Sequence, residues 1–225
     1  MITQNKIKST VGLESGMKLP LMEEFFSIQG EGFHTGKPAW FIRIGGCDVG
    51  CHWCDVKESW DANIHPLTDT DKIVENASKY PAKAVVVTGG EPCMYDLNYL
   101  TLQLKKNDIQ TYLETSGAYG ITGEWDWICI SPKKNMSVLK ENFLKANELK
   151  AIIYNKDDFR FAEDNARQMY DVRCTVYGLK QPEAILFLQP EWSKREEMLP
   201  LIVEYVQKNP GWMISLQTHK YMGIP

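Results

Sequence analysis

The stretch "GGCDVGCHWCDVKESWD", residues 45–61, places three cysteines within eight positions, Cys47, Cys51 and Cys54. Thiolates are soft ligands that suit zinc, copper(I) and iron–sulfur clusters. A structural zinc site needs a fourth ligand, and His52 is a candidate for it. Because His52 adjoins Cys51, tetrahedral ligation by both side chains would be strained. Three cysteines can instead hold three irons of a [4Fe–4S] cluster and leave one iron open, as a catalytic metal site requires.

The remaining cysteines, Cys93, Cys129 and Cys174, do not form a second pair separated by two residues. Cys93 follows Pro92 in a glycine-rich turn, and the other two lie in apolar runs. Free cysteines are often buried, so we expect these three to pack in or near the core, with Cys93 the candidate for a chemical role. A zinc-bearing scaffold module, which would be colourless, remains the alternative to a brown iron–sulfur protein.

The composition is that of a globular protein, with 225 residues, 44% hydrophobic and 24% charged. The 25 basic and 29 acidic side chains give a net charge of -4, which argues against a nucleic-acid binder. No apolar run approaches the roughly 18 residues that would span a bilayer, and the N-terminus lacks the apolar stretch of a secretory signal. We therefore expect a cytoplasmic protein with reduced thiols and no membrane partner.

Residues 1–19 are polar and contain glycines, so we expect a flexible N-terminal extension followed by a single domain over residues 20–225. Apolar, β-branched runs alternate with helical patterns along that domain. We expect strands within residues 39–46, 83–92, 110–117, 127–133, 148–154, 183–190 and 212–219. We expect helices over residues 71–80, around Leu97, Leu100 and Leu104, over residues 157–169, and near Pro200. This alternation predicts an α/β fold, a parallel sheet with helices outside.

The strands end in polar or glycine-rich sequences, namely GGC, TGGEP, ETSG, SPK, LQP and QTHK. Any one of these could be an ordinary turn. In parallel α/β folds, however, chemistry collects at the carboxyl ends of the strands. Six such endings together favour a functional site along one edge of the sheet.

The C-x3-C-x2-C spacing, with Trp53 before the last cysteine, resembles the signature of the radical S-adenosylmethionine (SAM) superfamily. The "TGGEP" of residues 88–92 resembles that superfamily's glycine-rich SAM contact. Further segments are similar to the 7-carboxy-7-deazaguanine synthases, namely "EEFFSIQGEGFHTGKPAWFIRIGGC", "CDVKESW", "VVVTGGEPC", "LETSG", "ISPK", "LQP" and "SLQTHKYMGIP". The similarity runs from Leu21 to Pro225. It implies a shortened partial (β/α)6 barrel, similar to a TIM barrel and of the radical SAM type.

The resemblance also implies a reaction. In that family, 6-carboxy-5,6,7,8-tetrahydropterin becomes 7-carboxy-7-deazaguanine by radical ring contraction with release of ammonia, a step of queuosine and deazapurine biosynthesis. SAM acts as a catalytic cofactor beside the [4Fe–4S] cluster, and Mg2+ assists. The implied partners are a small pterin substrate, a reductant such as flavodoxin or ferredoxin, and a second copy of the chain in a homodimer.

Site residues follow from the matching positions. The cluster ligands are Cys47, Cys51 and Cys54. The implied substrate contacts are Ile28, Gln29, Gly30, Glu31, Arg43, Thr88, His219 and Pro225. The implied SAM contacts are Gly90, Glu114, Ser116, Ser131, Pro132, Lys133 and Gln189. For Arg43 and Lys133 the alternative is a solvated side chain, and for His219 an incidental position near a chain end.

One position departs from the family pattern. Many members carry Thr or Ser two residues after the last cysteine, where the hydroxyl helps to hold Mg2+, but this chain has Val56. A valine has no oxygen to offer a cation that demands oxygen donors. We therefore expect Mg2+ to be held by the substrate carboxylate, water or another oxygen, or to matter less. A different radical SAM enzyme, such as a glycyl-radical activase, remains the alternative activity.

Overall fold

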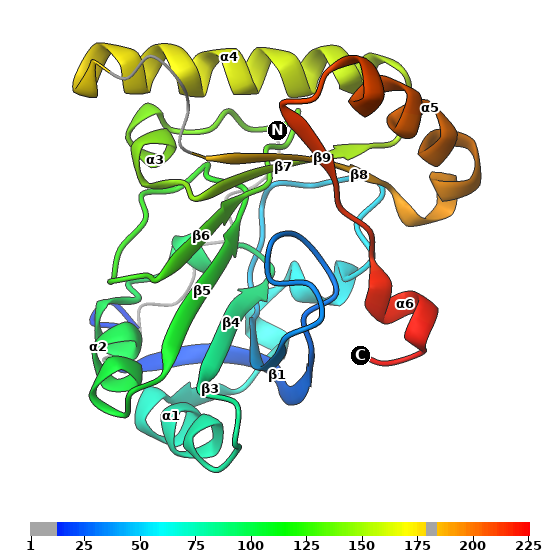
Figure 1. The fold of residues 1–225 in the computed structure, drawn as a ribbon. Helices are drawn as coiled ribbons and strands as arrows, with labels where there is room; N and C mark the ends of the chain where they lie inside the picture. The colour runs from blue at the N-terminus through cyan, green and yellow to red at the C-terminus, as the bar shows by residue number, and fades with distance from the viewer. Residues whose placement is uncertain (1–12, 179–183) are drawn as a thin grey trace.

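The computed structural model describes residues 13–178 and 184–225, whose strands form one nine-stranded sheet (Figure 1). The strands are β1 (Lys18–Ile28), β2 (Pro38–Ile44), β3 (Leu67–Asp69), β4 (Ala84–Gly89), β5 (Gln110–Thr115), β6 (Trp127–Ile130), β7 (Glu148–Ile153), β8 (Ile185–Pro190) and β9 (Trp212–Ile214). The helices are α1 (Thr70–Ser78), α2 (Asn98–Lys106), α3 (Lys140–Lys145), α4 (Asp157–Tyr177), α5 (Arg195–Lys208) and α6 (Thr218–Met222).

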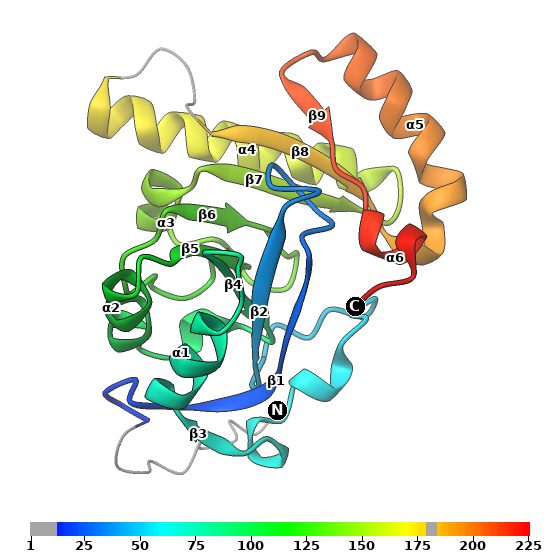
Figure 2. The same ribbon diagram turned by 60° about the horizontal axis from the view of Figure 1, so that its bottom comes forward.

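The sheet has the strand order β3-β1-β2-β4-β5-β6-β7-β8-β9. Every neighbouring pair from β2 to β9 is parallel, whereas β1 pairs antiparallel with β2 and with β3. Figures 1 and 2 show the sheet strongly curved but not closed, with α1 to α5 on its outer side and α6 beside the opening. This arrangement confirms the expected α/β fold, a partial barrel.

Side chains alternate between the two faces of each parallel strand. On β4, Val85 and Val87 belong to the main core under the helices, whereas Val86 packs in a smaller cluster on the inner face. All three valines are fully buried, as expected for a strand covered on both sides. The same period places Arg43 and Thr88 side by side on the inner face, because these two residues are paired in the β2–β4 register. The alternation thus delivers polar side chains into the interior of the barrel.

The predicted helices form where the apolar spacing places them. Ile73, Val74 and Ala77 of α1 are buried on one face, as are Leu100 and Leu104 of α2. Two expected boundaries were wrong. Helix α4 continues past residue 169 to Tyr177, and β9 ends at Ile214, so that residues 218 and 219 belong to α6. No described helix combines the length and the apolar character needed to cross a bilayer.

The strand over residues 18–28 was not predicted, because β1 does not alternate between apolar and polar side chains. Its glutamates are paired instead: Glu23 forms an ion pair with Arg43, and Glu24 accepts a hydrogen bond from the Trp40 indole. The expected boundary of the N-terminal extension at residue 19 was also wrong. Leu19 is fully buried and the Thr70 hydroxyl donates to the Gly16 carbonyl, so the fold begins before residue 20. Residues 1–12 of that extension lie outside the described part of the chain.

The junction of β2 and β4 depends on Gly89. Its φ of +113° lies in a region that side chains rarely adopt, and a Cβ atom there would lie 2.5 Å from the Ile44 nitrogen and 2.6 Å from the Ile44 oxygen. We expect Gly89→Ala to lower the free energy of unfolding by about 1–3 kcal/mol, measured by urea denaturation of the cluster-free protein. Gly120→Ala is the matched control, because a Cβ there meets no atom within 4 Å. Equal stability of the two variants would contradict this account of the junction.

Candidate functional site

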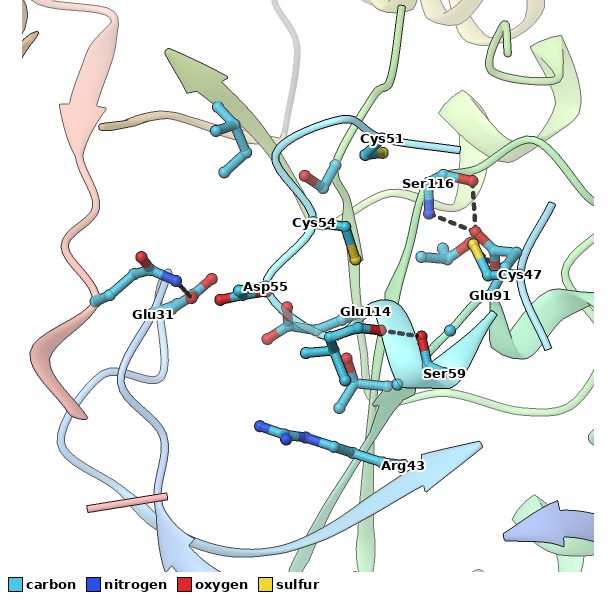
Figure 3. A pocket seen from close by; sticks show the side chains of 18 of the residues that line it. Glu31, Arg43, Cys47, Cys51, Cys54, Asp55, Ser59, Glu91, Glu114 and Ser116 are labelled. Atoms are coloured by element: carbon cyan, nitrogen blue, oxygen red, sulfur yellow. Dashed lines mark hydrogen bonds between the residues drawn. The ribbon is translucent and has the colours of Figure 1, made fainter. Parts of the chain in front are cut away.

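The carboxyl ends of the parallel strands surround a cavity of about 250 Å³ (Figure 3). The cysteine loop enters it after β2, the TGGEP turn after β4, the ETSG segment after β5 and the SPK segment after β6. The end of β1, the inner face of β7, the end of β8 and helix α6 complete the wall. The strand endings therefore meet at one edge, as the sequence predicted.

Nearly every residue expected at the site lines this cavity. The three cysteines, Val56 and all the expected substrate positions are on the wall, as are the expected SAM positions apart from Pro132. Pro132 is buried between Ser131 and Lys133 and does not reach the cavity. The cavity thus brings together residues that lie as far apart in the chain as Ile28 and Pro225. Their individual roles remain predictions.

Side chains from other parts of the chain hold the cysteine loop in place. The Asn135 side chain donates to the carbonyls of Val49 (3.0 Å) and Gly50 (2.8 Å), and the Tyr119 hydroxyl donates to Asp48. The glycine turn packs against the loop so closely that a Cβ on Gly90 would lie 2.3 Å from the Gly46 oxygen and 3.2 Å from the Cys47 Cβ. Any side chain at position 90 would therefore collide with the cysteine loop, whereas glycine does not.

The donor set fits an iron–sulfur cluster. Cys47, Cys51 and Cys54 are half-buried, unpaired thiols on one loop that face the cavity (Figure 3). Burial raises the pKa of Cys47 to about 11, so metal binding must displace its proton. His52 is not on the cavity wall and packs edge-on against Tyr154, which removes it as a fourth ligand. Among the described residues, no group of three His, Cys, Asp or Glu side chains is placed to hold a single metal ion.

Glu91 organises the wall of the cavity beside the cysteine loop. Its buried carboxylate accepts hydrogen bonds from the Cys93 amide (3.0 Å), the Thr115 hydroxyl (2.6 Å), and both the amide (2.8 Å) and the hydroxyl of Ser116. Ser116 is therefore already engaged by Glu91. Burial, with the nearby Glu91 charge, raises the pKa of the Cys93 thiol to about 12, as expected for a packing cysteine. The sequence analysis placed Glu91 in the TGGEP turn and predicted no role for it.

Lys133 faces the cavity rather than solvent. Its ammonium donates to both the carbonyl and the hydroxyl of Ser131, each at 2.6 Å, and lies 5.7 Å from the centroid of the Trp53 ring. Burial lowers the pKa of Lys133. The ammonium thus lies beside the cysteine loop, where it can bind an anionic group of a bound molecule.

On the opposite side, four residues form a hydrogen-bonded ring that closes through the main-chain amide of Glu31. Lys150 of β7 donates to Glu31 Oε2 (2.5 Å) and Glu114 Oε2 (3.0 Å). Gln29 donates to Glu114 Oε1 (2.8 Å) and accepts from the Glu31 amide (3.3 Å). Sequence reasoning missed Lys150. The available signal was the alternation of "ELKAII", because outward-facing Leu149 and Ala151 leave Lys150 on the inner face.

Arg43 and the C-terminal segment form the third part of the wall. Glu23 holds one Arg43 nitrogen at 2.7 Å, and the guanidinium lies 5.1 Å from the Phe25 ring centroid. The Ser27 hydroxyl donates to the Pro225 carbonyl (2.8 Å), and the Thr218 amide donates to the Gly30 carbonyl (2.9 Å). These bonds hold α6 and the chain end over the cavity. Arg43, His219 and Pro225 therefore all border the cavity, and their contacts with a substrate stay predictions.

Comparisons with known proteins identify this architecture. Residues 41–129 match the model described as the Radical SAM superfamily. The chain is 60% identical over 215 residues to 7-carboxy-7-deazaguanine synthase of Flavobacterium psychrophilum, which covers 96% of this chain and 97% of that protein. This chain belongs to the 7-carboxy-7-deazaguanine synthase family.

Two further relatives in that family show how far the similarity extends. The 7-carboxy-7-deazaguanine synthase of Synechocystis is 43% identical over 205 residues, covering 91% of this chain and 93% of that protein. The crystal structure of QueE from Escherichia coli superposes with a TM-score of 0.75 at 30% identity, covering 92% of this chain and 96% of that one. The family relationship inferred from the sequence motifs is confirmed.

Asn135 provides a test of how the cysteine loop is held. Asn135→Ala removes both hydrogen bonds to the Val49 and Gly50 carbonyls, so we expect the reconstituted protein to lose iron to a chelator several-fold faster, at about 1 kcal/mol per lost bond. Iron retention under anaerobic conditions is the measurement. Asn107→Ala is the control, because Asn107 also donates to a backbone carbonyl but on the exposed end of α2. Identical iron loss in both variants would show that Asn135 does not support the cluster.

Proposed function

We propose that this chain converts 6-carboxy-5,6,7,8-tetrahydropterin into 7-carboxy-7-deazaguanine and ammonia, using a [4Fe–4S] cluster and SAM. The observation that carries the proposal is that one cavity is lined by three cysteines on one side and by an arginine and paired carboxylates on another. The family relationship supports the same reaction. The reaction is redox-neutral, because the atoms of the substrate equal those of the product plus ammonia, so SAM can be regenerated in each cycle.

The cofactor side of the cavity fits its expected ligands. When bound, the cluster and SAM supply the 5'-deoxyadenosyl radical that starts the ring contraction. Cys47, Cys51 and Cys54 would hold three irons, and Gly90 would present its backbone to SAM at a position where a side chain would collide with the cysteine loop. Lys133 carries a positive charge to this side and can bind the SAM carboxylate.

The substrate side offers matching partners for a carboxylated pterin. Arg43 is held by Glu23 but keeps guanidinium donors for the substrate carboxylate. Ile28, Gln29 and Glu31 lie against the cavity from the end of β1, and His219 and Pro225 close it from the C-terminal side. Phe25 and Phe41 add apolar wall that excludes water from the reacting groups.

Mg2+ does not fit the position at which many family members hold it. Val56 has no side-chain oxygen, and its carbonyl already accepts the Ser59 hydroxyl at 2.6 Å. The neighbouring Asp55 carboxylate is paired with Lys220 at 2.7 Å. We therefore assign Mg2+ no ligand from this chain and no part in the steps above.

We also propose that a flavodoxin or ferredoxin reduces the cluster and that the chain works as a cytoplasmic homodimer. These proposals rest on the family resemblance. Reduction of the cluster by each purified electron carrier tests the first of them. Light scattering of the purified protein tests the dimer.

Turnover tests the proposed reaction. Anaerobic reconstitution should give a brown protein with roughly four irons and four sulfides per chain. With SAM, a reductant and carboxytetrahydropterin, we expect deazaguanine absorbance and one ammonia per product. Cys47→Ala, Cys51→Ala and Cys54→Ala should each fold and abolish turnover. A colourless zinc protein would favour the scaffold module. A brown protein that cleaves SAM without consuming the pterin would favour another radical enzyme.

Restoring the missing hydroxyl tests the assignment of Mg2+. We expect Val56→Thr to make turnover more responsive to added Mg2+ than the wild-type chain, because a threonine hydroxyl adds an oxygen donor beside the substrate. The measurement is kcat/KM as a function of Mg2+ after chelation. Val56→Ala is the control, since it shortens the side chain without adding oxygen. A wild-type dependence as strong as that of the threonine variant would contradict the assignment.

A further inference from the structure

Lys150 lies at the centre of a charged group that the cofactor chemistry does not require. Its side chain is only 3% exposed, and its two carboxylate partners come from two other elements. Glu31 follows β1, and Glu114 is near the end of β5. All three side chains line the cavity. Burying one ammonium with two carboxylates carries a large desolvation cost, and apolar side chains would serve stability as well or better.

The three groups depend on one another electrostatically. Burial alone would raise the pKa of Glu31, but the Lys150 charge and the hydrogen bonds to Glu31 lower that pKa to about 2. The two carboxylates in turn raise the pKa of Lys150 against the effect of its burial. The group therefore carries a net charge of -1, the sum of two negative charges and one positive charge. Without the lysine, two half-buried carboxylates would share one site, and one of them would take up a proton.

The carboxylates retain capacity to accept further hydrogen bonds. Each carboxylate oxygen has two lone pairs. Among the described residues, Gln29 supplies one donor to Glu114 Oε1 and Lys150 one donor to Glu114 Oε2. Gln217 donates to Glu31 Oε1 at 2.8 Å. Two adjacent carboxylates can thus accept hydrogen bonds from a ligand with adjacent N–H donors.

We propose that Lys150 is a positioning residue that keeps Glu31 and Glu114 ionised side by side to accept hydrogen bonds from the 2-amino-4-oxopyrimidine edge of the substrate. This inference rests on the proposed function and deepens it. It places Glu114 in the substrate half of the site, whereas the resemblance had placed that residue at SAM. The contacts favour this placement, because Glu114 bonds to Gln29 and Lys150 and not to the serines beside the cysteine loop.

Strand β7 also holds Gly32 and Phe33, the two residues that follow Glu31. Glu148, two residues before Lys150 on β7, accepts the Phe33 amide at 3.0 Å. A Cβ on Gly32 would lie 2.3 Å from Glu148 Oε1, so the loop and the strand are in close contact. The two inward-facing polar side chains of β7 thereby hold the loop of residues 31–33. The position of Glu31 is set by the framework rather than by the ligand.

The pH behaviour of the group is defined by its surroundings. The titratable and charged groups that act on Lys150 or Glu31 from the packed elements are Glu31, Glu114, Cys129, Lys133, Glu148, Lys150 and His219. In the wild-type chain the Lys150 charge and the hydrogen bonds to Glu31 keep the pKa of Glu31 low, so this carboxylate stays ionised through neutral pH. Removing Lys150 raises a carboxylate pKa, so ligand binding in that variant strengthens as pH rises through the new pKa.

The experiment measures binding of pterin-6-carboxylate, a fluorescent compound with the same pyrimidine edge, to the reconstituted enzyme with SAM. We expect Lys150→Met to weaken this binding about 10- to 100-fold at neutral pH. The affinity of Lys150→Met is divided by that of the wild type at each pH from about pH 6 to pH 8, which cancels any titration of the ligand. We expect this ratio to rise with pH. SAM affinity should be unchanged. Lys72→Met, which removes a lysine from an exposed ion pair, is the control and should bind like the wild type.

A second variant guards against a folding defect. Lys150→Met with Glu114→Gln restores the net charge of -1, so it should bind the pterin weakly but without the pH dependence. A Lys150→Met variant that binds the pterin like the wild type, loses SAM equally, or loses affinity independently of pH would overturn the role of Lys150. If the wild-type enzyme neither binds the pterin nor turns it over, the proposed function itself fails. If the wild-type enzyme binds and turns over the pterin, the results for the variants test the inference about Lys150 alone.

Discussion

The close approach of the β2 and β4 ends is the constraint on which the rest of the site depends. The Gly90 amide donates to the Ile44 carbonyl and the Glu91 amide to the Gly46 carbonyl, each at 2.8 Å. These bonds join the glycine turn to the start of the cysteine loop. Glycines permit this approach, because a Cβ on Gly89 would lie 2.5 Å from the Ile44 nitrogen and a Cβ on Gly90 would lie 2.3 Å from the Gly46 oxygen. The cysteine loop and the glycine turn are therefore fixed relative to each other by main-chain hydrogen bonds.

The opposite half of the cavity is built on a different principle. There the wall consists of ionised side chains, which need partners when they are buried. Lys150 with its two carboxylates and Arg43 with Glu23 supply those partners. This division suits the proposed chemistry, because a metal cluster and a cofactor need a rigid backbone frame. A polar substrate needs hydrogen-bond donors and acceptors of defined charge.

Much of this was predictable from the sequence, and what could not be predicted has identifiable causes. The cysteine spacing and the glycine turn are local, so their chemistry could be assigned before any fold was known. Apolar runs in the sequence also predicted the parallel strands. Strand β1 did not, since Glu23 and Glu24 are satisfied by partners on other elements. Lys150 was missed for the same reason, because its partners lie 119 and 36 residues away in the chain.

The sequence by itself determined the cysteine spacing that predicts a cluster, the alternation of strands and helices, and the absence of a hydroxyl at Val56. It also determined which side chains share a face of each strand, because that period is local. Only the tertiary structure decided which face points inward. Strand curvature and register turned Arg43, Thr88, Glu114 and Lys150 into one cavity. The physical reason is that partnership between charges depends on distance in space, which the order of residues along a chain does not contain.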